Sequence, residues 1–183
     1  MSRPMNDCAA SRTFRLVTIV VVVAATLAIP AQIQAASPTG TVGDVTMTAV
    51  SFSHAEQTST GSMTLTIDGG TDGLGWNVTI LASAFVYAGP NGGTSIPASS
   101  FALTSAAEPV TTSGDAVDPT GGPRVPVASP LGTLDGTRKI AQADAGFGKG
   151  TYTQALGVSL TIPGQSAVGT YTCTLSITAS VGP

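Results

Sequence analysis

The stretch Tyr171-Thr-Cys-Thr-Leu-Ser-Ile-Thr-Ala179 alternates apolar residues with hydroxyl-bearing residues along its whole length. Successive side chains of a β-strand point to opposite faces of a sheet, so the apolar residues from Tyr171 to Ala179 share one face. Threonine suits the other face because it is β-branched and polar at once. The pattern therefore predicts a strand with one buried face and one solvated face.

The same kind of strand pattern recurs along the chain. The segments that carry it, or that read as shorter strands, are 42–52, 63–68, 76–81, 82–87, 99–104 and 156–162. No stretch after residue 35 has the periodicity of an amphipathic helix. These features predict an all-β fold, either a single β-sandwich or a barrel-like domain.

Segments rich in Gly, Asp and Pro separate the long strands. Asp68-Gly-Gly-Thr-Asp-Gly-Leu-Gly75 is dense in residues that tolerate positive φ, which predicts a hairpin loop. Pro163-Gly-Gln-Ser-Ala-Val-Gly169 is expected to join the last two long strands in a similar way. A longer stretch, 105–136, is rich in proline, and loops of that length are uncommon in compact domains. We expect it to be one long loop of the same domain, with a short edge strand around 124–127.

The N-terminus has the pattern of a secretory signal peptide. Arginines in the first 15 residues precede an apolar run from Leu16 to Ile29. Pro30 and small residues follow, so cleavage is predicted between Ala35 and Ala36. The alternative is a permanent membrane anchor, but a helix that spans a bilayer needs about 20 apolar residues.

This assignment divides the chain into a signal helix, residues 1–35, and one secreted domain, residues 36–183. The domain carries nine acidic side chains and only four basic ones. So few Lys and Arg residues cannot neutralise many phosphates, which argues against nucleic acid and anionic membranes as partners. Low charge density and abundant Thr, Ser and Gly are typical of an extracellular β-protein. We therefore expect the protein to be secreted, with its place at the extracellular cell surface.

Cys8 lies in the predicted signal peptide, so the secreted domain keeps Cys173 alone and can form no internal disulfide. Cys173 lies on the apolar face of its strand, which predicts a buried structural thiol. The alternative is a reactive thiol. Such a thiol needs electropositive surroundings, and no Lys, Arg or His is close to Cys173 in sequence.

His54 is the only histidine of the chain. A serine–histidine arrangement needs an orienting acid and an oxyanion site, and a zinc site needs several nitrogen or sulfur ligands. We therefore expect no enzyme activity, no metal site and no cofactor. The aspartates beside Gly or Pro leave calcium binding as an alternative, but Asp-Gly pairs ordinarily form turns.

Several segments resemble the WxL domain family of bacterial cell-surface proteins. They are Asp68-Gly-Gly-Thr-Asp-Gly-Leu-Gly-Trp-Asn-Val-Thr-Ile80, Ala145-Gly-Phe-Gly-Lys-Gly-Thr-Tyr152, Leu160-Thr-Ile-Pro-Gly164 and Ala167-Val-Gly-Thr-Tyr-Thr-Cys-Thr-Leu175. The similarity covers about the whole of 36–183. It implies an extracellular, non-catalytic β-domain that associates with the cell wall without a covalent link, commonly through peptidoglycan.

The resemblance implies that Trp76, Asn77 and Val78 are binding residues. Val78 stands where the family has Leu, and Ile177-Thr178-Ala179 stands where a second Trp-x-Leu motif is expected. Trp76 also has a second interpretation, as a core residue, because a large aromatic side chain that alternates with apolar residues usually buries most of its area.

Two functions stay open from the sequence. The first is a wall-associated surface protein that binds a polymer such as peptidoglycan, or other surface proteins. The second is a self-assembling structural subunit of an extracellular fibre or surface layer, because Thr-rich edge strands can pair between chains.

Overall fold

The computed structural model describes residues 16–23, 37–43, 45–128 and 130–183. This part of the chain is built of β-strands, with one 3-10 turn at Ala98–Ser100 and no α-helix. The strands are β1 (Leu16–Val23), β2 (Thr39–Val42), β3 (Val45–Met47), β4 (Val50–Ser51), β5 (Gln57–Asp68), β6 (Trp76–Ala82), β7 (Val86–Tyr87), β8 (Phe101–Ala106), β9 (Val110–Gly114), β10 (Gly132–Thr133), β11 (Arg138–Ala143), β12 (Gly150–Ile162) and β13 (Thr170–Val181). The all-β prediction is confirmed.

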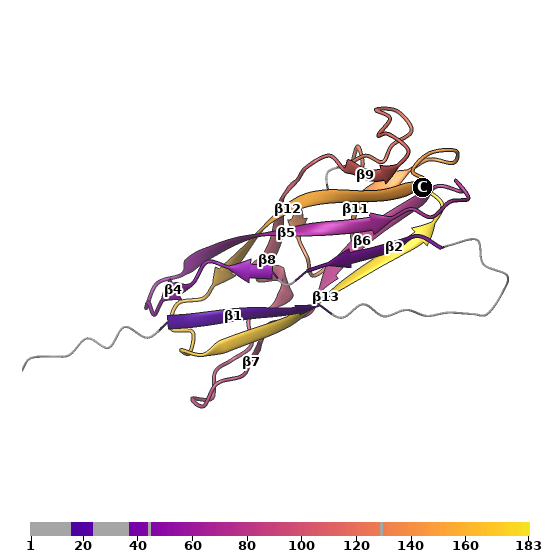
Figure 1. The fold of residues 1–183 in the computed structure, drawn as a ribbon. Helices are drawn as coiled ribbons and strands as arrows, with labels where there is room; N and C mark the ends of the chain where they lie inside the picture. The colour runs from indigo at the N-terminus through magenta and orange to yellow at the C-terminus, as the bar shows by residue number, and fades with distance from the viewer. Residues whose placement is uncertain (1–15, 24–36, 44, 129) are drawn as a thin grey trace, which may run out of the picture.

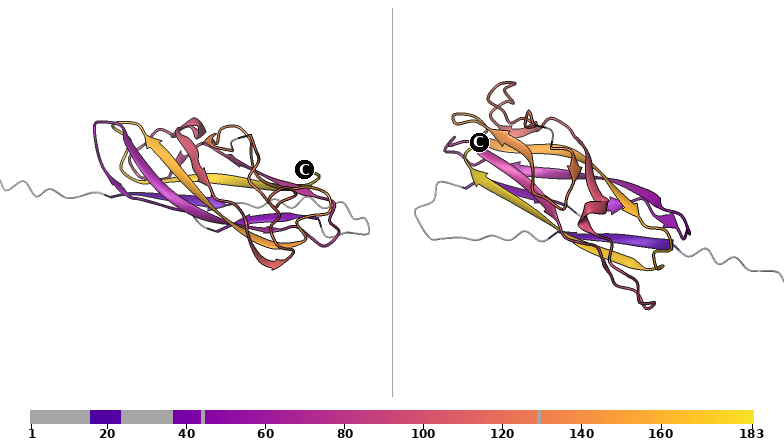
Figure 2. Two further views of the ribbon diagram at one scale, coloured as in Figure 1. Left: turned by 90° about the horizontal axis from the view of Figure 1, so that it is seen from above. Right: turned by 180° about the vertical axis from the view of Figure 1, so that it is seen from behind.

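The strands form two antiparallel sheets that do not close into a barrel (Figure 1). One sheet has the order β10-β8-β12-β5-β3, with β2 beside β5 and β9 beside β12. The other has the order β13-β6-β11, with β7 beside β13. β1 lies between β3 and β13, antiparallel to β3 and parallel to β13. Figure 2 shows the elongated domain from above and from behind.

The core lies on the strand faces that the alternation predicted. In β5, Met63, Leu65 and Ile67 are buried while the threonines between them are exposed. In β13, every second residue from Tyr171 to Ile177 is buried. Each large apolar side chain removed from water contributes about 1.5–3 kcal/mol to folding. The inner faces of the long strands therefore supply most of the core.

The connection 68–75 is not a hairpin loop, contrary to the sequence prediction. β5 pairs with β12, β2 and β3, whereas β6 pairs with β13 and β11, so this connection crosses from one sheet to the other. The connection 163–169 joins β12 to β13 as expected, and it crosses between the sheets as well. Alternation shows which face of a strand is buried but not which strand lies beside it.

Two other segments differ from the sequence prediction. The strand expected at 42–52 is divided among β2, β3 and β4. Within the long loop, 105–136, the structure contains β9 and β10 but no strand at 124–127, where Arg124 makes a single bridge to Gln142. Pro123 and Pro126 have no N–H group to donate, which prevents a continuous ladder at this place.

The structure describes only residues 16–23 of the predicted signal peptide, and they form β1. Residues 1–15 and 24–36 lie outside the described residues, so cleavage of a signal helix before Ala36 stays a prediction. No helix in the described part of the chain is long and apolar enough to cross a membrane.

Candidate functional site

Trp76 begins β6 and points into the core, where its side chain is only 1% exposed. Its indole Nε1 donates a hydrogen bond to the carbonyl oxygen of Gly148 at 2.9 Å. The ring lies 6.2 Å from that of Tyr152, measured between centroids. The interpretation of Trp76 as a core residue is therefore confirmed.

Two glycine-rich segments that are far apart in sequence close around this indole. The backbone of Gly69 donates to the carbonyl oxygen of Gly150 at 2.8 Å, and that of Gly146 donates to Gly73 at 2.7 Å. Gly148 has a φ of +73°, and a Cβ there would lie 2.7 Å from Nε1 of Trp76. The sequence predicted a turn at 68–75 but gave no sign that it meets the segment around Gly148, because turn composition does not report long-range contacts.

Asn77 and Val78 follow Trp76 on β6. Val78 is fully buried, whereas Asn77 is half-buried and its Nδ2 donates to the carbonyl oxygen of Gly182 at 2.7 Å. The assignment of these three residues to ligand binding stays a prediction. In the structure, Asn77 is the one member of the three whose side chain reaches solvent.

Cys173 lies on the inner face of β13 and is 3% exposed. Burial raises the pKa of its thiol to about 12, because an apolar surrounding disfavours the charged thiolate. Only the thiolate is a strong nucleophile. The prediction of a buried structural thiol is confirmed by this placement.

His54 lies in the exposed connection between β4 and β5. Its ring stacks edge to face on Phe52, with 5.1 Å between the centroids. The described residues contain no group of three or more His, Cys, Asp or Glu side chains that are placed to hold a metal ion.

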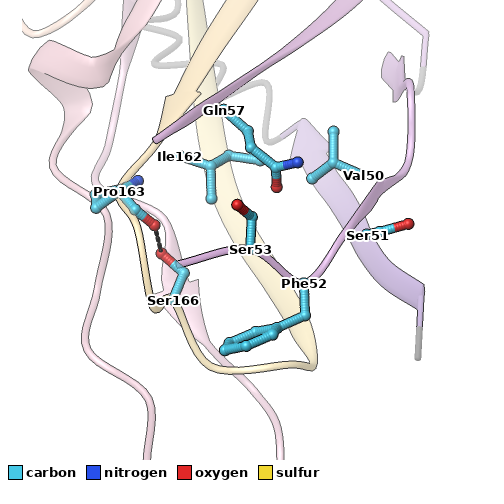
Figure 3. Close-up of a pocket in the computed structure, with 8 residues that line it drawn as sticks. All are labelled: Val50, Ser51, Phe52, Ser53, Gln57, Ile162, Pro163 and Ser166. Carbon is cyan, nitrogen blue, oxygen red and sulfur yellow. Dashed lines mark hydrogen bonds between the residues drawn. The ribbon is translucent and has the colours of Figure 1, made fainter. Parts of the chain in front are cut away.

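A small hollow lies beside this connection, at the end of the domain (Figure 3). Its lining combines apolar side chains with hydroxyls and one amide, from Val50, Ser51, Phe52, Ser53, Gln57, Ile162, Pro163 and Ser166. The Ser166 hydroxyl donates to the carbonyl oxygen of Pro163 at 2.7 Å. The hollow measures about 10 Å³, which is room for one water molecule at most. It is therefore too small to enclose a sugar ring.

Charged side chains hold the long loop, 105–136, through one contact to the body of the domain and one within the loop. The guanidinium of Arg124 contacts both carboxylate oxygens of Asp144, at 2.9 and 3.0 Å. Glu108 accepts a hydrogen bond from the backbone N–H of Val125 at 2.9 Å. The first contact fixes the loop to Asp144, just after β11, and the second joins two parts of the loop to each other.

Asp118 closes a turn within the long loop. Its Oδ1 accepts hydrogen bonds from the backbone N–H groups of Thr120 and Gly121, at 2.8 and 2.7 Å, and from the Thr120 hydroxyl. The hydrogen bond from Gly121 is the largest cause that lowers the pKa of this carboxyl, followed by those from Thr120. This arrangement is a local turn, as expected for aspartate beside proline and glycine.

No protein-family model matches this chain, and a search of curated proteins finds no match either. The resemblance to the WxL domain family thus rests on the quoted segments alone and stays a prediction.

Proposed function

We propose that this protein is a secreted, non-catalytic cell-surface protein whose β-sandwich domain associates non-covalently with a cell-wall polymer such as peptidoglycan. The N-terminal secretion pattern and the resemblance of the turn segments to the WxL domain family support the proposal. The two antiparallel sheets support the sandwich assignment.

The observation that carries the proposal is the outer face of β5 and β12, which we call the hydroxyl face. Its members are Thr58, Thr60, Ser62, Thr64 and Thr66 on β5 and Thr151, Thr153, Ser159 and Thr161 on β12. The β5 members are exposed, and residues such as Thr66 and Thr153 lie directly opposite each other in the ladder. One charged side chain, Asp68, lies on the same face at the end of β5, opposite Thr151.

A face of this kind suits a neutral, repetitive polymer. Each hydroxyl can donate and accept hydrogen bonds, as sugar hydroxyls and amides require. A single such bond contributes only about 0.5–1.5 kcal/mol net. Binding to a polymer would therefore depend on many contacts along the sheet, which fits a wide face better than the one-water hollow beside Phe52.

Self-assembly is the second candidate function, and the edge strand β9 favours it. β9 pairs with β12 on one side, and in the described part of the chain no strand covers its other side. Its first residue, Val110, is 64% exposed, and the strand carries no charge to oppose pairing with another chain.

Sedimentation with purified peptidoglycan separates the two candidates. Wall association predicts that the protein pellets with peptidoglycan and stays monomeric in its absence. Self-assembly predicts oligomers that grow with protein concentration whether or not peptidoglycan is present. A protein that stays monomeric and remains in the supernatant would contradict the proposed function.

A further inference from the structure

Strand β1 joins the two sheets. It pairs with β13 in six consecutive positions, from Thr18 opposite Thr170 to Val23 opposite Leu175. On its other side, Val20 and Val21 pair with β3. Figures 1 and 2 show β1 lying along β13 from each viewpoint. In the described part of the chain, β1 is the strand that links β3 to β13.

The same eight residues belong to the segment that secretion would remove. Cleavage before Ala36, which is part of the proposed function, would take β1 away and leave a seam between β3 and β13. The opposite edge of β13 is already paired with β7 and β6. On the seam side, the backbone groups of Thr170–Leu175 would then have no strand partner, and unpaired edges readily accept another strand.

The seam has none of the features that protect a sheet edge. Thr170-Tyr-Thr-Cys-Thr-Leu175 contains no charge and no proline, and its register with β1 is free of bulges. Tyr171 and Leu175 on this stretch are fully buried against the core. A strand that fits here must be uncharged and extended over about six residues, or about 20 Å. The sequence of β1, LVTIVVVV, has this chemistry.

We propose that the seam between β3 and β13 is a strand-acceptor site. Leu16–Val23 fills it in the intact chain. After cleavage, it binds an extended, uncharged segment of another surface protein, rich in β-branched residues, which adds parallel to β13. Binding of another protein after cleavage rests on the proposed secretion, whereas the existence of the acceptor site does not.

A partner protein fits the seam better than a second copy of the domain does. The incoming strand must be free on both edges, because it pairs with β3 on one side and β13 on the other. Every described strand of four or more residues after residue 36 already pairs within its own sheet. A second copy would have to give up its own pairing to supply such a strand.

The first experiment uses the full chain with a protease site placed within residues 24–36. After cutting, the N-terminal fragment should co-elute with the domain in size-exclusion chromatography. Val21→Pro should abolish co-elution, because Val21 pairs with both Cys173 and Val45 and proline cannot donate to a ladder. Val21→Ile is the matched control and should retain the fragment. If the fragment of the wild-type chain separates from the domain after cutting, the proposal of a strand-acceptor site is wrong.

The second experiment tests the site in trans. The cut Val21→Pro chain, freed of its fragment, is mixed with a synthetic LVTIVVVV peptide flanked by lysines for solubility. In a Cys8→Ser background, the peptide should slow labelling of Cys173 by a thiol reagent, and a peptide with alternate valines changed to aspartate should not. Dimers that form instead and exclude the peptide would show that a second copy is the occupant. N-terminal sequencing of secreted material tests the proposed secretion separately from either result.

Discussion

The indole Nε1 of Trp76 donates a hydrogen bond to the carbonyl oxygen of Gly148, which lies 72 residues further along the chain, at 2.9 Å. This contact links the start of β6 to the turn that precedes β12, so it joins one sheet to the other. The two glycine-rich segments, 68–75 and 145–150, thus pack around the buried indole of Trp76.

Trp76→Ala should lower the free energy of unfolding by about 3–5 kcal/mol, the usual cost of removing a large buried aromatic side chain. Trp76→Phe is the control, because it keeps an aromatic ring but removes the donor to the Gly148 carbonyl. It should lower the free energy of unfolding by about 1–3 kcal/mol, the cost of a buried acceptor without a partner. Urea denaturation measures both. Native tryptophan fluorescence of the wild type should be blue-shifted and protected from quenchers. A red, readily quenched spectrum would show that Trp76 is exposed.

Gly148→Ala should destabilise the protein more than Gly146→Ala does. Both glycines have positive φ, +73° and +92°, so each alanine introduces backbone strain of about 1–3 kcal/mol. A Cβ at Gly148 would also press against Trp76, whereas nothing lies within 4 Å of a Cβ at Gly146. Equal losses of stability in urea would contradict the packing described for the indole.

Alkaline pH should destabilise the protein partly through Cys173. The thiol of the folded protein has a pKa raised to about 12 from an ordinary value near 9. The folded state therefore keeps a proton that the unfolded state has lost, and this contribution to stability is full below pH 9 and disappears as pH rises towards 12. Urea midpoints of wild type and Cys173→Ala should diverge over that range. A wild type that loses no more stability than the alanine variant would refute the burial of the thiol.

Secretion predicts that the exported protein begins close to Ala36. N-terminal sequencing or intact mass of culture material decides this directly. A product that retains Met1 would refute the secretion hypothesis and would leave Leu16–Val23 as a permanent strand of the domain.

The strand content was predictable because burial leaves a period of two in the sequence, as between Tyr171 and Ala179. Which strands lie beside one another in the sheets could not be predicted in this way. The segment 68–75 has the composition of a hairpin loop, yet it crosses between sheets, because positive φ is needed in both kinds of connection. The contact between Trp76 and Gly148 left no local signal either. Proline and glycine at 105–136 indicated a loop, but the short pairing of β9 with β12 depends on a partner distant in sequence.

The segment Leu16–Ile29 shows that one sequence pattern can be compatible with two structures. An uninterrupted apolar, β-branched run satisfies both the central region of a signal peptide and a strand paired on both edges. The sequence analysis assigned this run to a signal peptide, with a membrane anchor as the alternative and no strand, whereas Leu16–Val23 forms a strand in the structure. The segment can have both roles if it directs secretion as a signal peptide and forms β1 for as long as the chain is uncleaved.

A negative charge placed on the hydroxyl face tests whether this face binds the wall polymer. Thr64 is an exposed member of this face on β5, and Thr178 is an exposed threonine on β13 in the other sheet. Both can be changed to glutamate without disturbing the core, so urea denaturation should show similar stability for the two variants. They form a matched pair for a binding measurement.

Co-sedimentation of the wild type, Thr64→Glu and Thr178→Glu with purified peptidoglycan is therefore the most direct measurement. We predict that the wild type and Thr178→Glu pellet with the polymer, and that Thr64→Glu remains largely in the supernatant because a charge interrupts the hydroxyl face. Binding that is unchanged by Thr64→Glu, or absent from the wild type, would contradict wall association through this face.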